Sequence, residues 1–229
     1  MDQAPQPSSQ GPGALFTDLD QATAAVVMGV ATQRHLPAGN TLFHQGDPPS
    51  QLFQVRTGLV RLTRVNPEGE QTTLRFMGPG DLVGCVAVFR RFPFPATATA
   101  TRATTVLCWG AAQILDLVRR YPAVSANALN AVGDRTREMV DRLAEITDKG
   151  IEARVASVVL RLVAQVGRNG PKGPEIATPV TRKDVSEMTG VSYFTVSRIL
   201  GGWQRQGLVR LGRARIIVLD PYRLAQIAG

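Results

Sequence analysis

Hydrophobic and polar residues alternate over short distances between residues 36 and 110. Runs such as LFQV, LVRLTRV, TTLRFM and TTVLCW are separated by glycines, including Gly58 and Gly84. Runs of this length, bounded by turn residues, are typical of strands, and NPEGE at 66–70 is typical of a hairpin turn. Because no helical stretch is expected between the strands, the pattern predicts an antiparallel β-roll or barrel over residues 15–121.

A helical pattern replaces the strand pattern at Pro122 and continues to Asp148. Apolar positions recur there at alternating spacings of three and four residues, which predicts one long helix that pairs with a second copy of itself. The alternative is a helix that packs only on its own domain. The predicted dimer seam consists of Leu129, Val132, Thr136, Met139, Leu143 and Ile146. We expect Asp148 to cap the next helix, and GRNGPKGPE at 167–175 to form a loop.

Two capping signals lie close together in TRKDVSEMTGVSYFTVSRIL, residues 181–200. Thr181 and Asp184 have the spacing of a capping box, and Ser192 can cap a second helix. Gly190 between them can adopt the positive φ angle of a tight turn. The stretch therefore predicts a helix-turn-helix, whose second helix fits the major groove of DNA.

A predicted hairpin follows this helix pair. GLVRLGRARIIVLDP, residues 207–221, has the pattern of two strands around a Gly-Arg turn. Such a wing can bring Arg213 and Arg215 to DNA phosphates. We therefore expect residues 149–229 to form a winged helix-turn-helix domain.

Charge is distributed unevenly along the chain. Residues 1–148 contain 13 arginines and 13 acidic residues, whereas residues 149–229 contain 13 basic and 5 acidic residues. All of the net charge of +8 therefore lies in the predicted helix-turn-helix domain, which indicates a polyanionic partner, nucleic acid rather than membrane. Residues 1–14 are expected to be a disordered lead-in. No apolar run approaches the roughly 20 residues that cross a bilayer, so we expect a soluble, cytoplasmic protein.

Few side chains are available for cofactor chemistry. Cys85 and Cys108 lack the spacing of a disulfide framework or a metal site, so we expect buried thiols. His35 and His44 are too few for the metal cluster of a cupin enzyme. No cysteine precedes Cys85 to ligate an iron–sulfur cluster. We therefore expect no metal, no cofactor and no catalysis.

Three stretches and the long helix together resemble the CRP/FNR family of bacterial transcription regulators. The stretches are LPAGNTLFHQGDPPSQLFQVRTGLVRL at 36–62, GPGDLVGCVAVF at 78–89 and TRKDVSEMTGVSYFTVSRIL at 181–200. The resemblance implies an α+β chain with a cyclic-nucleotide-binding-like roll, a dimerisation helix over 122–148 and a winged helix-turn-helix. It also implies a homodimer on a roughly palindromic site in double-stranded DNA, acting through RNA polymerase, with activation favoured over repression.

The resemblance also implies roles for individual residues. Arg198 matches the arginine that reads a guanine in the family, and Tyr193 and Phe194 fall at neighbouring base-reading positions. Members that respond to cyclic AMP have Arg and Glu there; Phe194 cannot accept a hydrogen bond from cytosine but can pack on a thymine methyl group or against its own domain. The positions that match phosphate contacts are Thr181, Arg182, Ser192 and Thr195.

The pocket for an effector departs from the pattern of the cyclic-AMP binders. The matching positions here are Gly84, Cys85, Phe94, Met139 and Val140, and three polar contacts of those members are replaced. A buried cyclic phosphate without a counter-charge is costly, so we expect a regulator that does not depend on cyclic AMP. Three alternatives stay open: a cyclic nucleotide in a shifted pocket near Arg90 and Arg91, oxidation of the Cys85 thiol, or an apolar ligand.

Overall fold

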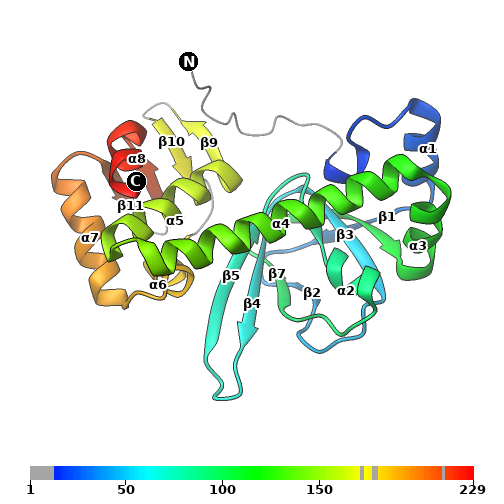
Figure 1. Ribbon diagram of the computed structural model, residues 1–229, viewed down its shortest axis with the longest axis horizontal. Coiled ribbons are helices and arrows are strands. Elements are labelled where there is room, and N and C mark those ends of the chain that lie inside the picture. The colour runs from blue at the N-terminus through cyan, green and yellow to red at the C-terminus, as the bar shows by residue number, and fades with distance from the viewer. Residues whose placement is uncertain (1–12, 171–172, 177–179, 213–214) are drawn as a thin grey trace. The chain divides into compact units, whose positions relative to one another are not determined.

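The computed structural model describes residues 13–170, 173–176, 180–212 and 215–229. These residues divide into two compact units (Figure 1). Among the described residues, one unit comprises residues 13–71 together with Met77–Met139, and the other comprises residues from Val140 onward together with Thr72–Phe76.

Strands β1 to β8 form two antiparallel sheets, which confirms the predicted roll. Their orders are β1-β8-β3-β6 and β2-β7-β4-β5. Buried residues of both sheets, such as Phe53 and Ala98, belong to one hydrophobic cluster. The strands are β1 (Thr32–Leu36), β2 (Thr41–Phe43), β3 (Gln51–Thr57), β4 (Val60–Val65), β5 (Gln71–Met77), β6 (Leu82–Val83), β7 (Thr97–Ala100) and β8 (Thr104–Gly110).

The predicted hairpin turn joins β4 to β5. The Asn66 amide donates to the Glu70 carbonyl at 3.0 Å, and the Gly69 amide donates to the Asn66 carbonyl at 3.0 Å. Gly69 has a φ of +85°, which a residue with a Cβ rarely adopts. The NPEGE motif is therefore confirmed as a turn.

Helical segments of the first unit contribute buried residues to the core of the roll. Its helical segments are η1 (Ala14–Phe16), α1 (Gln21–Gly29), α2 (Cys85–Arg90), α3 (Ala111–Arg120) and the start of α4 (Pro122–Asp148). The buried Trp109 donates its indole N–H to the Val27 carbonyl at 2.8 Å, which attaches β8 to α1. Asn127 of α4 donates to the carbonyls of Leu15, at 3.1 Å, and Thr17, at 2.7 Å.

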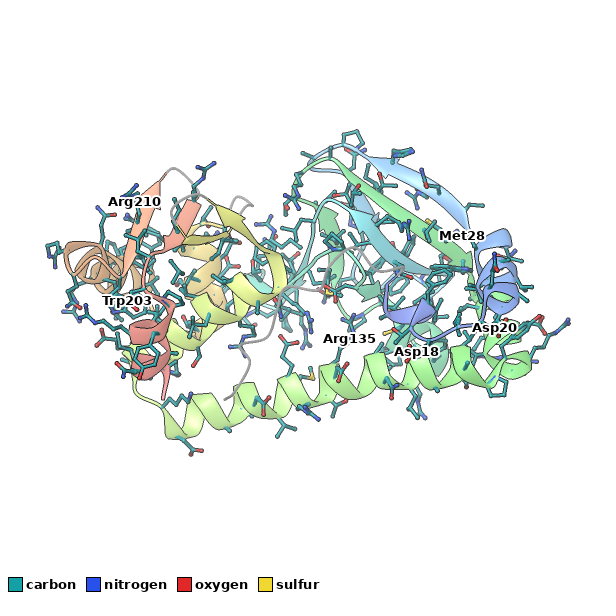
Figure 2. All side chains as sticks on the ribbon, turned by 90° about the horizontal axis from the view of Figure 1, so that it is seen from above. Asp18, Asp20, Met28, Arg135, Trp203 and Arg210 are labelled. Atoms are coloured by element: carbon teal, nitrogen blue, oxygen red, sulfur yellow. The ribbon has the colours of Figure 1, made fainter. Side chains whose placement is uncertain are left out.

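Helix α4 has the predicted bounds, and an arginine near its middle holds it to the roll. The Arg135 guanidinium (Figure 2) donates to the Leu82 carbonyl and contacts the Met77 sulfur at 3.6 Å. These contacts satisfy a backbone carbonyl at the end of the strand pair β3–β6.

Two expectations for the first unit need correction. Helix α2 lies within the roll, where no helix was expected, because Gly84 turns the chain at φ +85° and the following side chains Cys85 and Val88 are buried in the core. Ala14 begins η1, where its amide donates to the Gly80 carbonyl at 3.0 Å, rather than belonging to a disordered lead-in. Residues 1–12 of that lead-in lie outside the described residues.

The second unit is a winged helix-turn-helix, as predicted. Helix α5 packs against α6, α7 and α8, and the sheet has the order β11-β12-β10-β9. The elements are α5 (Ile151–Val166), β9 (Gly167–Gly170), β10 (Gly173–Ile176), α6 (Arg182–Thr189), α7 (Tyr193–Arg205), β11 (Val209–Gly212), β12 (Arg215–Val218) and α8 (Pro221–Ala228).

Two local predictions for this unit are wrong. Residues 167–170 and 173–176 form the strands β9 and β10 instead of a loop, because Glu175 pairs with Ile217 of β12. Gly150, with an extended backbone, precedes α5 in place of Asp148. Asp148 is the last residue of α4, so its backbone is helical and cannot take the cap conformation.

Candidate nucleic-acid interface and effector pocket

Side-chain caps define where α6 and α7 begin, and the cap of α6 is reciprocal. The Thr181 hydroxyl accepts a hydrogen bond from the Asp184 amide at 3.2 Å, and the Asp184 carboxylate accepts one from the Thr181 amide at 2.8 Å. The Ser192 hydroxyl accepts one from the Thr195 amide at 3.2 Å. Gly190, at φ +67°, makes the turn between the helices. The predicted caps and turn are therefore confirmed.

The inner face of α7 anchors the helix. Val196 and Leu200 are fully buried. Trp203 (Figure 2) is also buried, and its indole N–H donates to Glu152 Oε1 of α5 at 2.8 Å. A buried indole needs such an acceptor, so the bond fixes α7 on α5 and leaves the opposite face to solvent.

The outer face of α7 carries the three side chains predicted to read bases. Phe194 is 83% exposed, Tyr193 is 47% exposed, and Arg198 is exposed. The rings of Tyr193 and Phe194 meet edge to face, with centroids 5.9 Å apart and planes at 81°. Because Arg198 lies four positions after Phe194 in the helix, these two side chains lie on the same face.

Several predicted phosphate contacts surround one pocket of about 230 Å³. Its lining combines three cationic side chains with a hydroxyl and a phenol, a set that suits a phosphate group. They come from the start of α6, from α7 and from β12, which are separated in the sequence. The residues that line the pocket are Val180, Thr181, Arg182, Lys183, Tyr193, Leu211, Gly212, Arg215 and Ile216.

Lys183 was not predicted for this pocket, although it follows Arg182 in the first turn of α6. Its ammonium group lies 3.7 Å from Glu187 Oε1, and its side chain is 74% exposed. The signal available in the sequence was this position next to an expected phosphate contact.

Two further predicted phosphate contacts, Ser192 and Thr195, do not line the pocket and lie at the start of α7. The hydroxyl groups of Ser192 and Thr195 are 2.9 Å apart and hydrogen-bonded to each other. Ser192 is exposed, whereas Thr195 is half-buried.

The wing is tied directly to the second helix. The Leu211 amide of β11 donates to Gln204 Oε1 of α7 at 3.0 Å. Arg210, also on β11, is exposed (Figure 2). Arg213 lies outside the described residues.

The predicted dimer seam is largely exposed on this single chain. Leu129, Met139 and Leu143 are 71%, 69% and 66% exposed, and Thr136 is exposed as well. Val132 is half-buried and packs on the core of the roll. The side chain of Ile146 lies outside the described residues. An apolar row of this kind on one helix is suited to burial against a partner.

The predicted effector residues lie in two places. Gly84, Cys85 and Phe94 are close together in the roll, and a Cβ atom added at Gly84 would lie 2.7 Å from Phe94 Cε1. The Phe94 ring is buried and stacks on Phe43, with ring centroids 3.7 Å apart. The space next to Gly84 is therefore filled by Phe94.

The remaining predicted effector residues are on the surface. Met139 and Val140 on α4 are 69% and 58% exposed. Arg90 and Arg91, which could rescue a shifted pocket, are also exposed.

Both cysteines are buried free thiols, as expected. Cys85 is 2% and Cys108 is 1% exposed. Burial raises the pKa of the Cys108 thiol above its usual value, against a smaller opposing effect of Arg34. A thiol in this setting is chemically unreactive.

Within the described ranges, no three His, Cys, Asp or Glu side chains are grouped as ligands for a metal ion. Among the same residues, every helix is too short or too polar to cross a membrane.

Two family models match the chain. Residues 33–121 match the cyclic nucleotide-binding domain, and residues 153–227 match the Crp-like helix-turn-helix domain.

Similar proteins and structures span almost the whole chain. The chain is 30% identical over 214 residues to the cyclic AMP receptor protein of Thermus thermophilus, covering 93% of this chain and 96% of that protein. It is 26% identical to the CRP-like cAMP-activated global transcriptional regulator of Mycobacterium tuberculosis, with the same coverage.

The structure is similar to that of FixK2 from Bradyrhizobium japonicum. The TM-score is 0.77 at 22% identity, and the match covers 87% of this chain and 98% of FixK2. The two domain matches, the 30% identity and the helix-turn-helix described above agree: the chain belongs to the CRP/FNR family of bacterial transcription regulators.

Proposed function

We propose that the protein is a homodimer that binds a roughly palindromic DNA operator and activates transcription through RNA polymerase in the cytoplasm. The observation that carries the proposal is the exposed face of α7. It presents Arg198 in the same unit as a pocket lined by Arg182, Lys183 and Arg215. An exposed arginine on a helix that fits the major groove can donate two hydrogen bonds to O6 and N7 of guanine.

The cationic pocket supports a role in orienting the protein on DNA. Phosphate contacts fix register and orientation without reading sequence, whereas base-edge contacts discriminate between sequences. In this proposal Thr181, Arg182, Ser192, Thr195 and Arg215 hold phosphates. The predicted phosphate contact of Arg213 is proposed on the sequence alone.

Dimerisation is supported by the apolar row on α4. Leu129, Met139 and Leu143 would be buried between two copies of the helix. Two recognition helices would then lie about 34 Å apart, in successive major grooves of one face of the duplex. Activation in preference to repression rests on the resemblance to a family rich in activators.

In this proposal the protein binds its operator without cyclic AMP. Two of the similar proteins are named for cyclic AMP. In our proposal, this chain differs from them in not requiring that effector. The stacking of Phe94 on Phe43 next to Gly84 supports the difference, because a nucleotide at that place would have to displace a buried ring.

Selection of bound duplexes from random sequence tests the proposal. The purified wild type, without added nucleotide, is expected to enrich a palindrome that contains a guanine in each half-site. Arg198→Ala is expected to lose discrimination at that guanine by a factor of about 5 to 150, while its binding at low salt falls much less. A uniform loss of affinity on all sequences would contradict the role of Arg198.

Repeating the selection under other conditions separates the alternatives. Enrichment only with a cyclic nucleotide would identify an effector-gated regulator, and enrichment that depends on reductant would identify a thiol switch at Cys85. Failure to bind any duplex at modest ionic strength under all of these conditions would refute DNA binding itself.

A further inference from the structure

Phe194 is an apolar side chain within a strongly cationic surface. At 83% exposure it is the most exposed large hydrophobic residue of the described chain. It lies on the same face of α7 as Arg198, and its neighbour Tyr193 lines the cationic pocket. When DNA covers this face, Phe194 becomes buried against DNA, because residues on both sides of it contact the duplex in the proposed function.

The two aromatic residues take different places on this face. Tyr193 shares the pocket with Thr181, Arg182 and Arg215, so its ring belongs to the phosphate side of the interface. Phe194 does not line that pocket and meets the Tyr193 ring edge to face, with a centroid distance of 5.9 Å. The Tyr193 ring therefore supports the Phe194 ring from the phosphate side and leaves the base side open.

A phenyl ring restricts what can be recognised on that base side. It has no hydrogen-bond donor or acceptor, so the polar atoms of guanine, adenine and cytosine edges gain nothing from it. The apolar group that the major groove presents is the C5-methyl group of thymine. The same methyl group is present on 5-methylcytosine.

The position of that methyl group can be bounded from the helix. Arg198 lies four positions after Phe194, which corresponds to a rise of about 6 Å along α7. Successive bases on one strand are about 3.4 Å apart. The methyl group therefore lies within about two base-pair steps of the guanine that Arg198 contacts.

We propose that Phe194 reads the C5-methyl group of a pyrimidine in each half-site, next to the guanine read by Arg198. The inference rests on the proposed DNA-binding function and adds a second specificity determinant to it. Burial of one methyl group corresponds to about a three- to fivefold gain in affinity per half-site, and to roughly ten- to twentyfold for both half-sites of a dimer.

The test replaces thymines in the selected operator one at a time, symmetrically in both half-sites, by deoxyuridine, which lacks only the methyl group. Wild-type protein is expected to lose roughly ten- to twentyfold in affinity at one position within two steps of the guanine. Phe194→Ala is expected to bind the thymine and deoxyuridine operators equally at that position. Phe194→Leu, which keeps an apolar side chain, should retain part of the sensitivity.

Methylated cytosine gives an independent measurement at the same position. A cytosine there should bind weakly, and 5-methylcytosine should recover about three- to fivefold per half-site with wild type but not with Phe194→Ala. Phe92→Ala, which removes a partly exposed phenyl ring from the roll, is the matched control and should retain wild-type sensitivity at every position.

Three results would overturn the inference while leaving the proposed function intact. They are a selected half-site without a thymine in reach of the guanine, wild-type binding that ignores every deoxyuridine, or equal deoxyuridine sensitivity in wild type and Phe194→Ala. Absence of selective binding to any duplex would instead mean that the proposed function has failed.

Discussion

The ring of Phe94 stacks on the ring of Phe43 inside the β-roll, with centroids 3.7 Å apart and planes inclined by 15°. Phe94 follows helix α2, and its ring covers Gly84 at the start of that helix. The Phe94 ring therefore connects strand β2, which carries Phe43, with the start of α2 and with the segment that follows α2. The roll of this chain is therefore packed by its own side chains at the place where the sequence suggested an effector.

Phe94→Ala should destabilise the roll strongly. Loss of a buried phenyl ring leaves a cavity and is expected to lower the free energy of unfolding by about 3–5 kcal/mol, measured by urea denaturation. Phe92→Ala, at a partly exposed ring, should change it by only about 0.5 kcal/mol. Equal small effects of both substitutions would show that the Phe94 ring does not pack as described.

Charges placed in the α4 seam should prevent dimerisation. Met139→Glu combined with Leu143→Glu puts four carboxylates into the apolar contact of a dimer, and we expect a monomer by sedimentation equilibrium. The monomer should also bind the operator more weakly than the wild-type dimer. The control is Arg137→Glu, at an exposed flanking position, which should remain a dimer. A double variant that still sediments as a dimer would refute the seam.

Arg182→Ala should weaken DNA binding by a similar factor on every sequence. Loss of one phosphate contact per chain reduces counterion release, so the slope of log affinity against log salt should decrease by about 1 for each half-site. Arg119→Ala, at an exposed position on α3, is the control and should leave the slope unchanged. A change confined to particular base pairs would indicate base reading by Arg182 instead.

The bond between Trp203 and Glu152 should contribute to the stability of the second unit. Glu152→Ala leaves the buried indole N–H without its acceptor, and a loss of about 1 kcal/mol in the free energy of unfolding is expected. Glu152→Gln keeps an oxygen acceptor and should stay close to wild type. Identical losses in the two variants would show that the carboxylate charge, and not the hydrogen bond, is what matters.

Neither cysteine should react in the folded protein. Both side chains are buried, and the raised pKa of Cys108 keeps it in the thiol form at pH values where an ordinary thiol begins to ionise. When the protein is titrated with an aromatic disulfide reagent at pH 8, the native protein should release no aromatic thiolate. The denatured protein should release two equivalents per chain, one for each cysteine. Release of one equivalent from native protein, abolished by Cys85→Ser and accompanied by a change in DNA binding, would favour the thiol-switch alternative.

The elements that the sequence predicted correctly depend on local signals. The Thr181–Asp184 capping box, Gly190 and the Ser192 cap each act within a few residues, so the helix-turn-helix could be found without knowledge of its surroundings. The alternating three- and four-residue spacing of apolar positions likewise predicted helix α4 with its observed bounds.

The elements that were missed depend on contacts distant in sequence. CVAVFR has the β-branched and aromatic composition of a strand, yet burial of Cys85 and Val88 in the core of the roll makes it the helix α2. Residues 173–176 become a strand through pairing with β12, about 40 residues later. The cationic pocket joins Arg182 of α6 to Arg215 of β12, so the pocket itself could not be predicted from either segment alone.

The hydrogen bond from the Leu211 amide to Gln204 Oε1 has a consequence for the operators that the protein tolerates. Because it joins β11, the strand that carries Arg210, to α7, the helix that carries Arg198, the distance between the wing and α7 is fixed within each monomer. Inserting a single base pair inside a half-site should therefore be tolerated poorly, since one set of contacts must be given up to keep the other.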